Sequence, residues 1–75
     1  MNEKLAFIYK QLIDNVEGCC VTRDDGTMWM SVYLDNACPN DMSHHAFAGY
    51  LSQLTALGLY KRIHGTAFGD VKLTQ

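Results

Sequence analysis

The spacing of apolar residues predicts a helix at the start of the chain. Apolar side chains recur there at i, i+3, i+4 and i+7, the spacing of one helical face, at Leu5, Ile8, Tyr9, Leu12, Ile13 and Val16. Asn2 is placed to cap the first turn, and Gly18 to end the helix in a left-handed conformation. We therefore expect the first helix over about residues 3–17.

A second helix is predicted from its cap at Ser43 to a terminator at Gly58. Its inward residues are expected to be Phe47, Tyr50, Leu51, Leu54 and Leu57. A terminal β-hairpin should follow, with strands over residues 59–64 and 71–74 around the turn GTAFGD. Leu59, Ile63, Val71 and Leu73 would close the core beneath it. Lys61 then shares the strand parity of Leu59 and Ile63, so the strand must twist or the lysine must snorkel outward.

The segment between these helices fits two structures. CCVT at 19–22 indicates a short strand, and RDDG at 23–26 has turn composition. Residues 27–38 fit a helix in which Met28 and Val32 share a face. They also fit a strand in which Met28, Met30 and Val32 lie on one face and Trp29, Ser31 and Tyr33 on the other. Local propensity favours the strand. We prefer the helix because a break and a capped helix follow directly.

Length and composition describe one small globular domain over residues 1–75. The chain has 48% hydrophobic and 19% charged residues, and no apolar run reaches the roughly 18 residues of a membrane span. MNEKLAFIYK lacks the features of a secretory signal, so we expect a soluble cytoplasmic protein. No catalytic constellation or phosphate-binding glycine loop is present, which predicts a non-enzyme without a cofactor.

The cysteines do not have the spacing of a metal site. Cys19, Cys20 and Cys38 could be combined with His44 and His45, but C-x-x-C and H-x3-H pairs are both missing. We expect reduced, buried, inert thiols and no bound metal.

Charge is distributed unevenly. The net charge is −2, but residues 1–42 carry three basic and seven acidic groups, a sum of −4, whereas residues 43–75 carry three basic and one acidic group, a sum of +2. An acidic scaffold with a mildly basic C-terminal half is compatible with an edge that faces DNA.

The stretch SHHAFAGYLSQLTALGLYKRI, residues 43–63, resembles the recognition helix and first wing strand of the winged-helix superfamily. Ser43 matches the cap, Leu51, Leu54 and Leu57 the core leucines, and Gly58 the exit into the wing. The resemblance implies an α+β fold, a minimal winged helix ordered helix, strand, helix, helix and two-stranded wing. The rival order is α-β-β-α-β-β, with residues 28–34 as a strand.

The resemblance implies a small regulator that binds double-stranded DNA, with the helix at about residues 43–57 in the major groove and residues 59–74 as the wing on the backbone. The positions implied to face bases are His44, His45, Ala48, Gly49 and Ser52. Those implied to face phosphates are Lys61, Arg62, His64 and Lys72. Gly49 weakens a helix by about 1 kcal/mol relative to alanine, so we expect a packing or close-approach reason for it.

A second hypothesis is a protein-interaction module of the same fold, for instance a phage- or plasmid-encoded inhibitor that occupies a host protein. The net acidity and the bland Ala48–Gly49 surface favour this hypothesis, whereas the basic wing favours DNA. A homodimer formed through the first helix or an edge strand is also compatible with the sequence.

Overall fold

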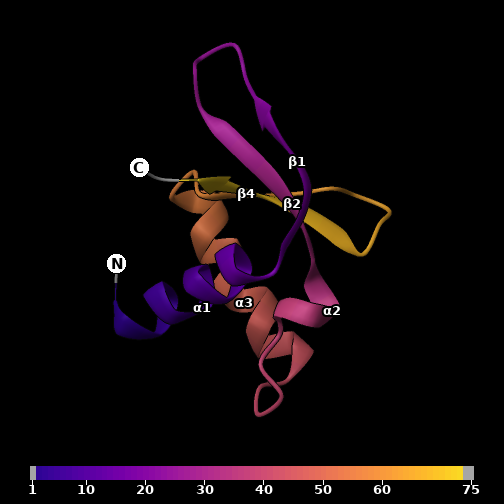
Figure 1. The fold of residues 1–75 in the computed structure, drawn as a ribbon. Coiled ribbons are helices and arrows are strands. Elements are labelled where there is room, and N and C mark those ends of the chain that lie inside the picture. The colour runs from indigo at the N-terminus through magenta and orange to yellow at the C-terminus, as the bar shows by residue number, and fades with distance from the viewer. Residues whose placement is uncertain (1, 74–75) are drawn as a thin grey trace.

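The computed structural model describes residues 2–73, apart from the side chain of Cys19, and shows an α+β fold (Figure 1). Its elements in chain order are α1 (Glu3–Asp14), β1 (Val16–Thr22), β2 (Met28–Tyr33), α2 (Leu34–Ala37), α3 (His44–Ala56), β3 (Tyr60–Arg62) and β4 (Phe68–Leu73). The four strands form one sheet in the order β1-β2-β4-β3, with every neighbouring pair antiparallel. The three helices lie together on one side of the sheet (Figure 1). The predicted α+β class is therefore confirmed.

The first helix begins where the sequence predicts and ends earlier. The Asn2 side chain accepts a hydrogen bond from the Leu5 amide at 2.7 Å, which confirms the cap. The prediction that the helix reaches residue 17 is wrong, because Val16 and Glu17 already pair with β2. Gly18, at φ +84°, lies in β1 where the β1–β2 register shifts, so it shapes a strand irregularity and does not end the helix.

The prediction of a helix over 27–38 is wrong for most of that segment. Residues 28–33 form β2, as in the rival order, and only Leu34–Ala37 are helical. The strand is favoured because β2 is a central strand that pairs with β1 on one side and β4 on the other. Val32 of this strand is fully buried, and the strand agrees with the local propensity of the segment.

The helix predicted after Ser43 is confirmed as α3. Ser43 Oγ accepts from the Ala46 amide at 3.1 Å, and Gly58 takes φ +75° just past the helix end. Phe47, Leu51 and Leu54 are buried as expected, and Tyr50 is half-buried. Leu57 is 55% exposed, so its predicted place in the core is wrong: it follows the helical segment as the C-cap residue.

The terminal hairpin is confirmed, with a shorter first strand and a different residue of that strand facing the core. Tyr60 lies opposite Val71 and is 3% exposed, so Tyr60 faces the core together with the fully buried Val71. Lys61 consequently points to the other face of the sheet, which removes the parity conflict that arises when Leu59 is taken as the inward residue. Residues 68–70, expected in the turn, belong to β4. Thr74, expected in the second strand, lies outside the described residues.

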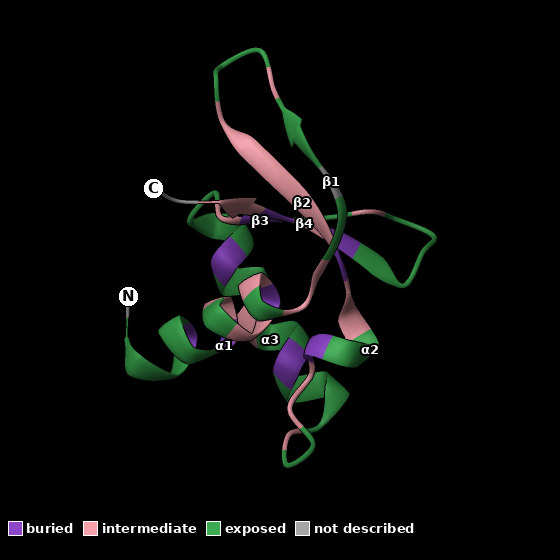
Figure 2. Ribbon diagram, viewed as in Figure 1, coloured by how far each residue is buried: buried purple, intermediate pink, exposed green. Residues whose placement is uncertain are grey.

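The core lies between the sheet and the helices and does not extend along the whole β1–β2 hairpin. The buried side chains come from α1, α2, α3 and the inner face of β2, β3 and β4. The half of the hairpin that carries the turn projects beyond the helices, and Figure 2 shows it as exposed or intermediate. Tyr9 holds α1 against the sheet by donating its hydroxyl proton to the Lys72 carbonyl.

Candidate interaction surfaces

Helix α3 presents a side that faces the β3–β4 turn across a groove. On one side the groove is lined by three residues of α3: His44, Ala48 and Ser52. On the other side it is lined by Arg62 and Thr66 of the β3–β4 hairpin and by Asp35 of α2. The groove has a volume of about 290 Å³. Four of the nine positions predicted to contact DNA are thus brought together: His44, Ala48, Ser52 and Arg62.

The two remaining helix positions do not line this groove. His45 and Gly49 are exposed on α3. A β-carbon added at Gly49 would meet no atom within 4 Å, so the packing reason expected for this glycine is absent. Helix α3 holds no Asp, Glu, Lys or Arg over its 13 residues. Its surface therefore offers none of the arginine or lysine contacts that most often read bases.

Two lysines predicted to contact phosphate, Lys61 and Lys72, lie away from α3. In the strand register, Lys61 of β3 lies opposite Asp70 of β4, and Lys72 of β4 lies opposite Trp29 of β2. Cross-strand partners share a face, so both lysines lie on the face of the sheet opposite the helices. His64 is exposed in the turn that joins β3 and β4. The nine predicted positions consequently do not form one continuous surface.

Tyr60 contributes the most buried polar group beside the groove. Its hydroxyl oxygen has almost no contact with solvent and no hydrogen-bond partner among the described residues. Burial is the main cause that raises the pKa of Tyr60 above its ordinary value of 10.0, so the phenol is protonated at neutral pH. An unsatisfied buried hydroxyl is costly, which makes it an unusual feature in so small a core.

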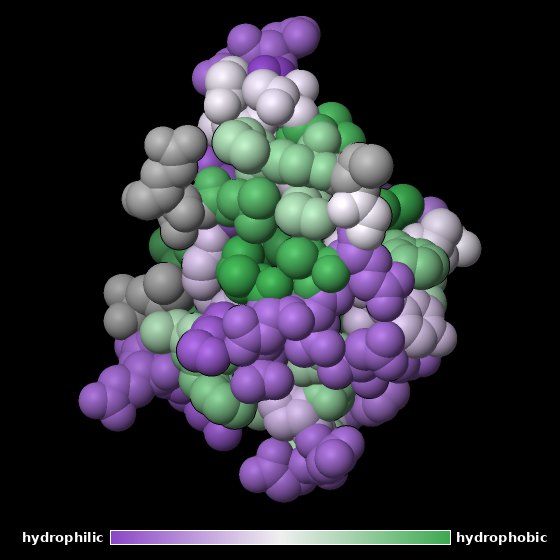
Figure 3. Space-filling view, in the orientation of Figure 1, coloured by the Kyte–Doolittle hydropathy of each residue, from purple (hydrophilic) through white to green (hydrophobic). Residues whose placement is uncertain are grey.

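The β1–β2 hairpin carries apolar side chains that the core does not cover. On the face away from the helices, Val21 is 60% exposed and lies opposite the half-buried Trp29. On the face toward the helices, Met28 and Met30 are also only half-buried. Figure 3 shows apolar side chains gathered in the middle of the molecule, between the polar hairpin tip and the polar surface of α1. In the sequence, the alternation of side chains over residues 28–34 indicated a strand with side chains on two faces.

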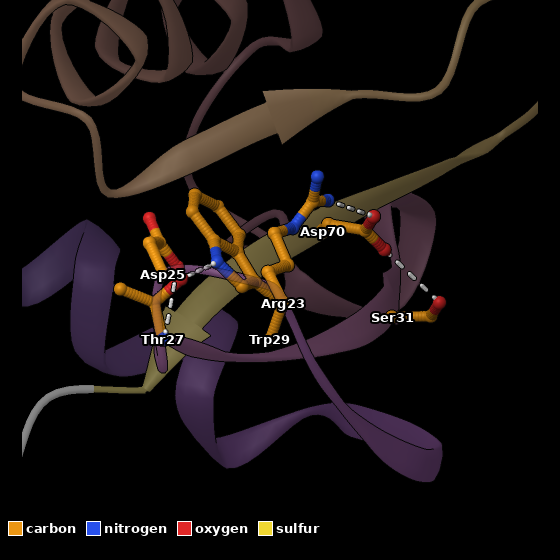
Figure 4. Close-up of polar contacts among 6 residues, drawn as sticks. All are labelled: Arg23, Asp25, Thr27, Trp29, Ser31 and Asp70. Carbon is orange, nitrogen blue, oxygen red and sulfur yellow. Dashed lines mark hydrogen bonds and ion pairs between the residues drawn. The ribbon is translucent and has the colours of Figure 1, made fainter.

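A polar network fixes the outer face of the hairpin (Figure 4). The Arg23 guanidinium lies 4.8 Å from the centre of the Trp29 ring and forms an ion pair with Asp70 at 3.3 Å. Asp70 also accepts from Ser31 Oγ at 3.2 Å, and the Trp29 indole N–H donates to Thr27 Oγ1 at 2.8 Å. Trp29 is therefore held by Arg23 over its ring and by Thr27 at its indole nitrogen.

The hairpin turn adds a carboxylate to this network. Asp25 accepts from the Thr27 hydroxyl at 2.6 Å and from the Thr27 amide at 3.0 Å. These hydrogen bonds lower the pKa of Asp25 below its ordinary value, because they stabilise the ionised carboxylate.

Cys20 and Cys38 are free thiols in different surroundings. Cys38 is half-buried, and burial followed by the charge of Asp35 raises its pKa. Cys20 is exposed, so the prediction that the thiols are buried is wrong at this position, where β1 lies at the sheet edge. Among the side chains described, which do not include that of Cys19, no group of three His, Cys, Asp or Glu residues is placed to hold a metal ion.

Comparison of the chain with protein-family models, with curated proteins and with solved structures finds no match in any of the three. Within the described residues, no helix has the length and apolar character needed to cross a membrane.

Proposed function

We propose that this chain is a protein-interaction module that docks on a partner protein through its β1–β2 hairpin. The observation that carries this proposal is the hairpin itself, which projects from the body (Figures 1 and 2). Its apolar side chains are incompletely buried on both faces. Val21, Trp29 and Met30 are incompletely buried on this hairpin, so a partner surface that covers them removes apolar area from water and is stabilised by doing so. Tryptophan, methionine and arginine are also the residues enriched at protein interfaces.

A protein fits this surface better than a nucleic acid does. The ring of Trp29 is covered by Arg23, and Tyr33 and Phe68 pack against each other with centroids 5.2 Å apart and planes tilted by 50°. Each of these rings already has one such neighbour, which reduces the ring area available for base stacking. The Arg23 charge is already paired with Asp70, and Asp24 and Asp25 occupy the hairpin tip.

The test is a pair of exposed substitutions of similar size on different elements. Val21→Lys places a charge on the hairpin, and Phe7→Lys, on α1 at a side chain 42% exposed, is the control. A photo-crosslinker at Thr22 identifies the partner in a host extract. We expect Val21→Lys to abolish the crosslinked product and Phe7→Lys to leave it unchanged. Equal loss from both variants, or no specific product, would refute the hairpin as the docking element.

Double-stranded DNA is a second candidate, favoured by one observation. Arg62 lies across a groove from His44 and Ser52 of α3, so one basic side chain accompanies the helix that the winged-helix resemblance assigns to the major groove. The order α3, Gly58, β3 and β4 supports a winged helix, whereas the four-residue α2 is short for the second helix of that fold.

DNA binding is tested by fluorescence anisotropy of a labelled random-sequence duplex at low and then physiological salt. A DNA-binding protein gives saturable binding that weakens steeply with salt and with Arg62→Ala. Because Lys72 lies on the opposite face of the sheet, Lys72→Ala should matter much less. An absence of binding at high micromolar protein in low salt would exclude this candidate.

A further inference from the structure

We propose that the groove between α2, α3 and the β3–β4 turn binds a small organic carboxylate, with Arg62 as the anchor for the carboxylate group. This site lies on the helical side of the molecule and is independent of the hairpin surface. Its volume, about 290 Å³, is close to the lower end of the range for ligand sites.

Arg62 places a positive charge at the groove, where it can bind an anion. It lines the groove beside Thr66 and makes no ion pair or hydrogen bond within residues 2–73. A guanidinium presents a fork of donors that matches the two oxygens of a carboxylate. Asp35 lines the same groove and holds a negative charge there, which favours a singly charged carboxylate over a doubly charged phosphate.

Tyr60 supplies a second observation that is independent of Arg62. Its side chain lines the groove, the residue is 97% buried (3% exposed), and its hydroxyl has no partner. A protonated phenol can donate one hydrogen bond to a ligand oxygen. Residues 64–67 of the adjoining turn are all exposed, and Thr66 and Ala67 of this turn line the groove together with Tyr60.

The rest of the groove suits the organic part of such a ligand. Phe47 and Leu51 line the groove with buried apolar side chains, and Ser52 lines it with a hydroxyl. A carboxylate joined to a ring or a branched chain therefore meets a cation at one end and apolar surface at the other.

The test is a titration of the isotope-labelled chain with phenylacetate, followed by NMR of the backbone amides. Phenethylamine, of similar size and opposite charge, is the control ligand. We expect saturable shifts at Ser52 and Thr66 with phenylacetate at millimolar concentration and none with phenethylamine. Arg62→Gln should weaken binding at least about tenfold, because it removes the charged hydrogen-bond donors that hold the carboxylate.

Lys61→Gln is the matched control, because Lys61 is the neighbouring cation and faces the opposite side of the sheet. It should leave the affinity unchanged, whereas Tyr60→Phe should lower it while the chain stays folded. The proposal is overturned if phenylacetate gives no saturable shift, if phenethylamine binds equally well, or if Lys61→Gln weakens binding as much as Arg62→Gln.

Discussion

The hydroxyl and ring of Tyr60 occupy the space in which any residue other than glycine at position 69 would place its β-carbon. Gly69 belongs to β4 and lies opposite Val32 on one side and Arg62 on the other. The tyrosine therefore folds over the backbone of the neighbouring strand. Its buried position and the absence of a side chain at Gly69 depend on each other.

Gly69→Ala should destabilise the protein by about 1–3 kcal/mol, the usual cost of overpacking a core. The added methyl would overlap the Tyr60 ring, so this ring, in a residue only 3% exposed, would have to shift from its packed position. The measurement is the free energy of unfolding from urea titration.

Gly49→Ala is the control for the same change in a helix. A β-carbon there meets no atom within 4 Å, so the variant should be more stable by up to about 1 kcal/mol, through helix propensity alone. Equal effects of the two substitutions would contradict the packing of Tyr60 against Gly69.

Tyr60→Phe should not lower stability, although it removes a polar group from the core. A hydroxyl that donates a hydrogen bond typically contributes about 1 kcal/mol, but the Tyr60 hydroxyl is buried without a partner, so its removal relieves a desolvation cost. Thermal and urea unfolding should show a variant as stable as the parent or slightly more stable. A loss of more than about 1 kcal/mol would show that the hydroxyl has a partner.

The same variant should change how stability depends on alkaline pH. Burial raises the pKa of Tyr60 above 10.0, so above that pH the unfolded chain loses the phenol proton while the folded chain keeps it. The unfolded state then binds fewer protons, and stability falls as pH rises. Tyr60→Phe should reduce this fall, measured as the urea midpoint between neutral pH and pH above 10.0.

The parts of this fold that follow from neighbouring residues were predictable from the sequence. Asn2, Ser43 and Gly58 act within one helical turn, and each has the role that its chemistry indicates. Residues 28–33 were not settled because their structure depends on pairing with β4, some 40 residues later in the chain. Local propensity favours the strand, but the break and the capped helix that follow favour a helix.

The candidate site was predictable in part for a related reason. His44, Ala48 and Ser52 share a side of α3, which helical spacing determines. The strand residues depend on register, and a shift of one position reverses the face of each side chain. Because Tyr60 faces inward, Lys61 and Lys72 leave the surface that was assigned to DNA, and only Arg62 stays beside α3.

Asp70→Asn should weaken the network that holds Trp29. The ion pair with Arg23 is partly exposed, with 37% and 24% of the two side chains accessible, so the loss should be no more than about 1 kcal/mol. Release of Arg23 from the indole should alter the emission of Trp29, the single tryptophan in the chain. Fluorescence spectra and urea titration measure both effects.

Asp14→Asn removes the partner of Lys10 in an exposed ion pair on α1 and serves as the control for Asp70→Asn. It should cost only about 0.3–0.5 kcal/mol and leave the tryptophan emission unchanged. A change in emission from both variants would indicate a global effect and not the Arg23 contact.

Cys20 and Cys38 should differ in reactivity with iodoacetamide. Cys20 is exposed, whereas Cys38 is half-buried, with its thiol near the carbonyl oxygens of Pro39 and Met42 and its pKa raised by burial and by Asp35. The thiolate is the reactive form, so a raised pKa and poorer access both slow alkylation.

The comparison uses two variants that both carry Cys19→Ser. The variant with Cys38→Ser keeps Cys20 as its single thiol, and the variant with Cys20→Ser keeps Cys38. The protein that keeps Cys20 should react about tenfold faster near neutral pH, and urea should remove the difference. Equal rates in the folded state would show that Cys38 is as accessible as Cys20.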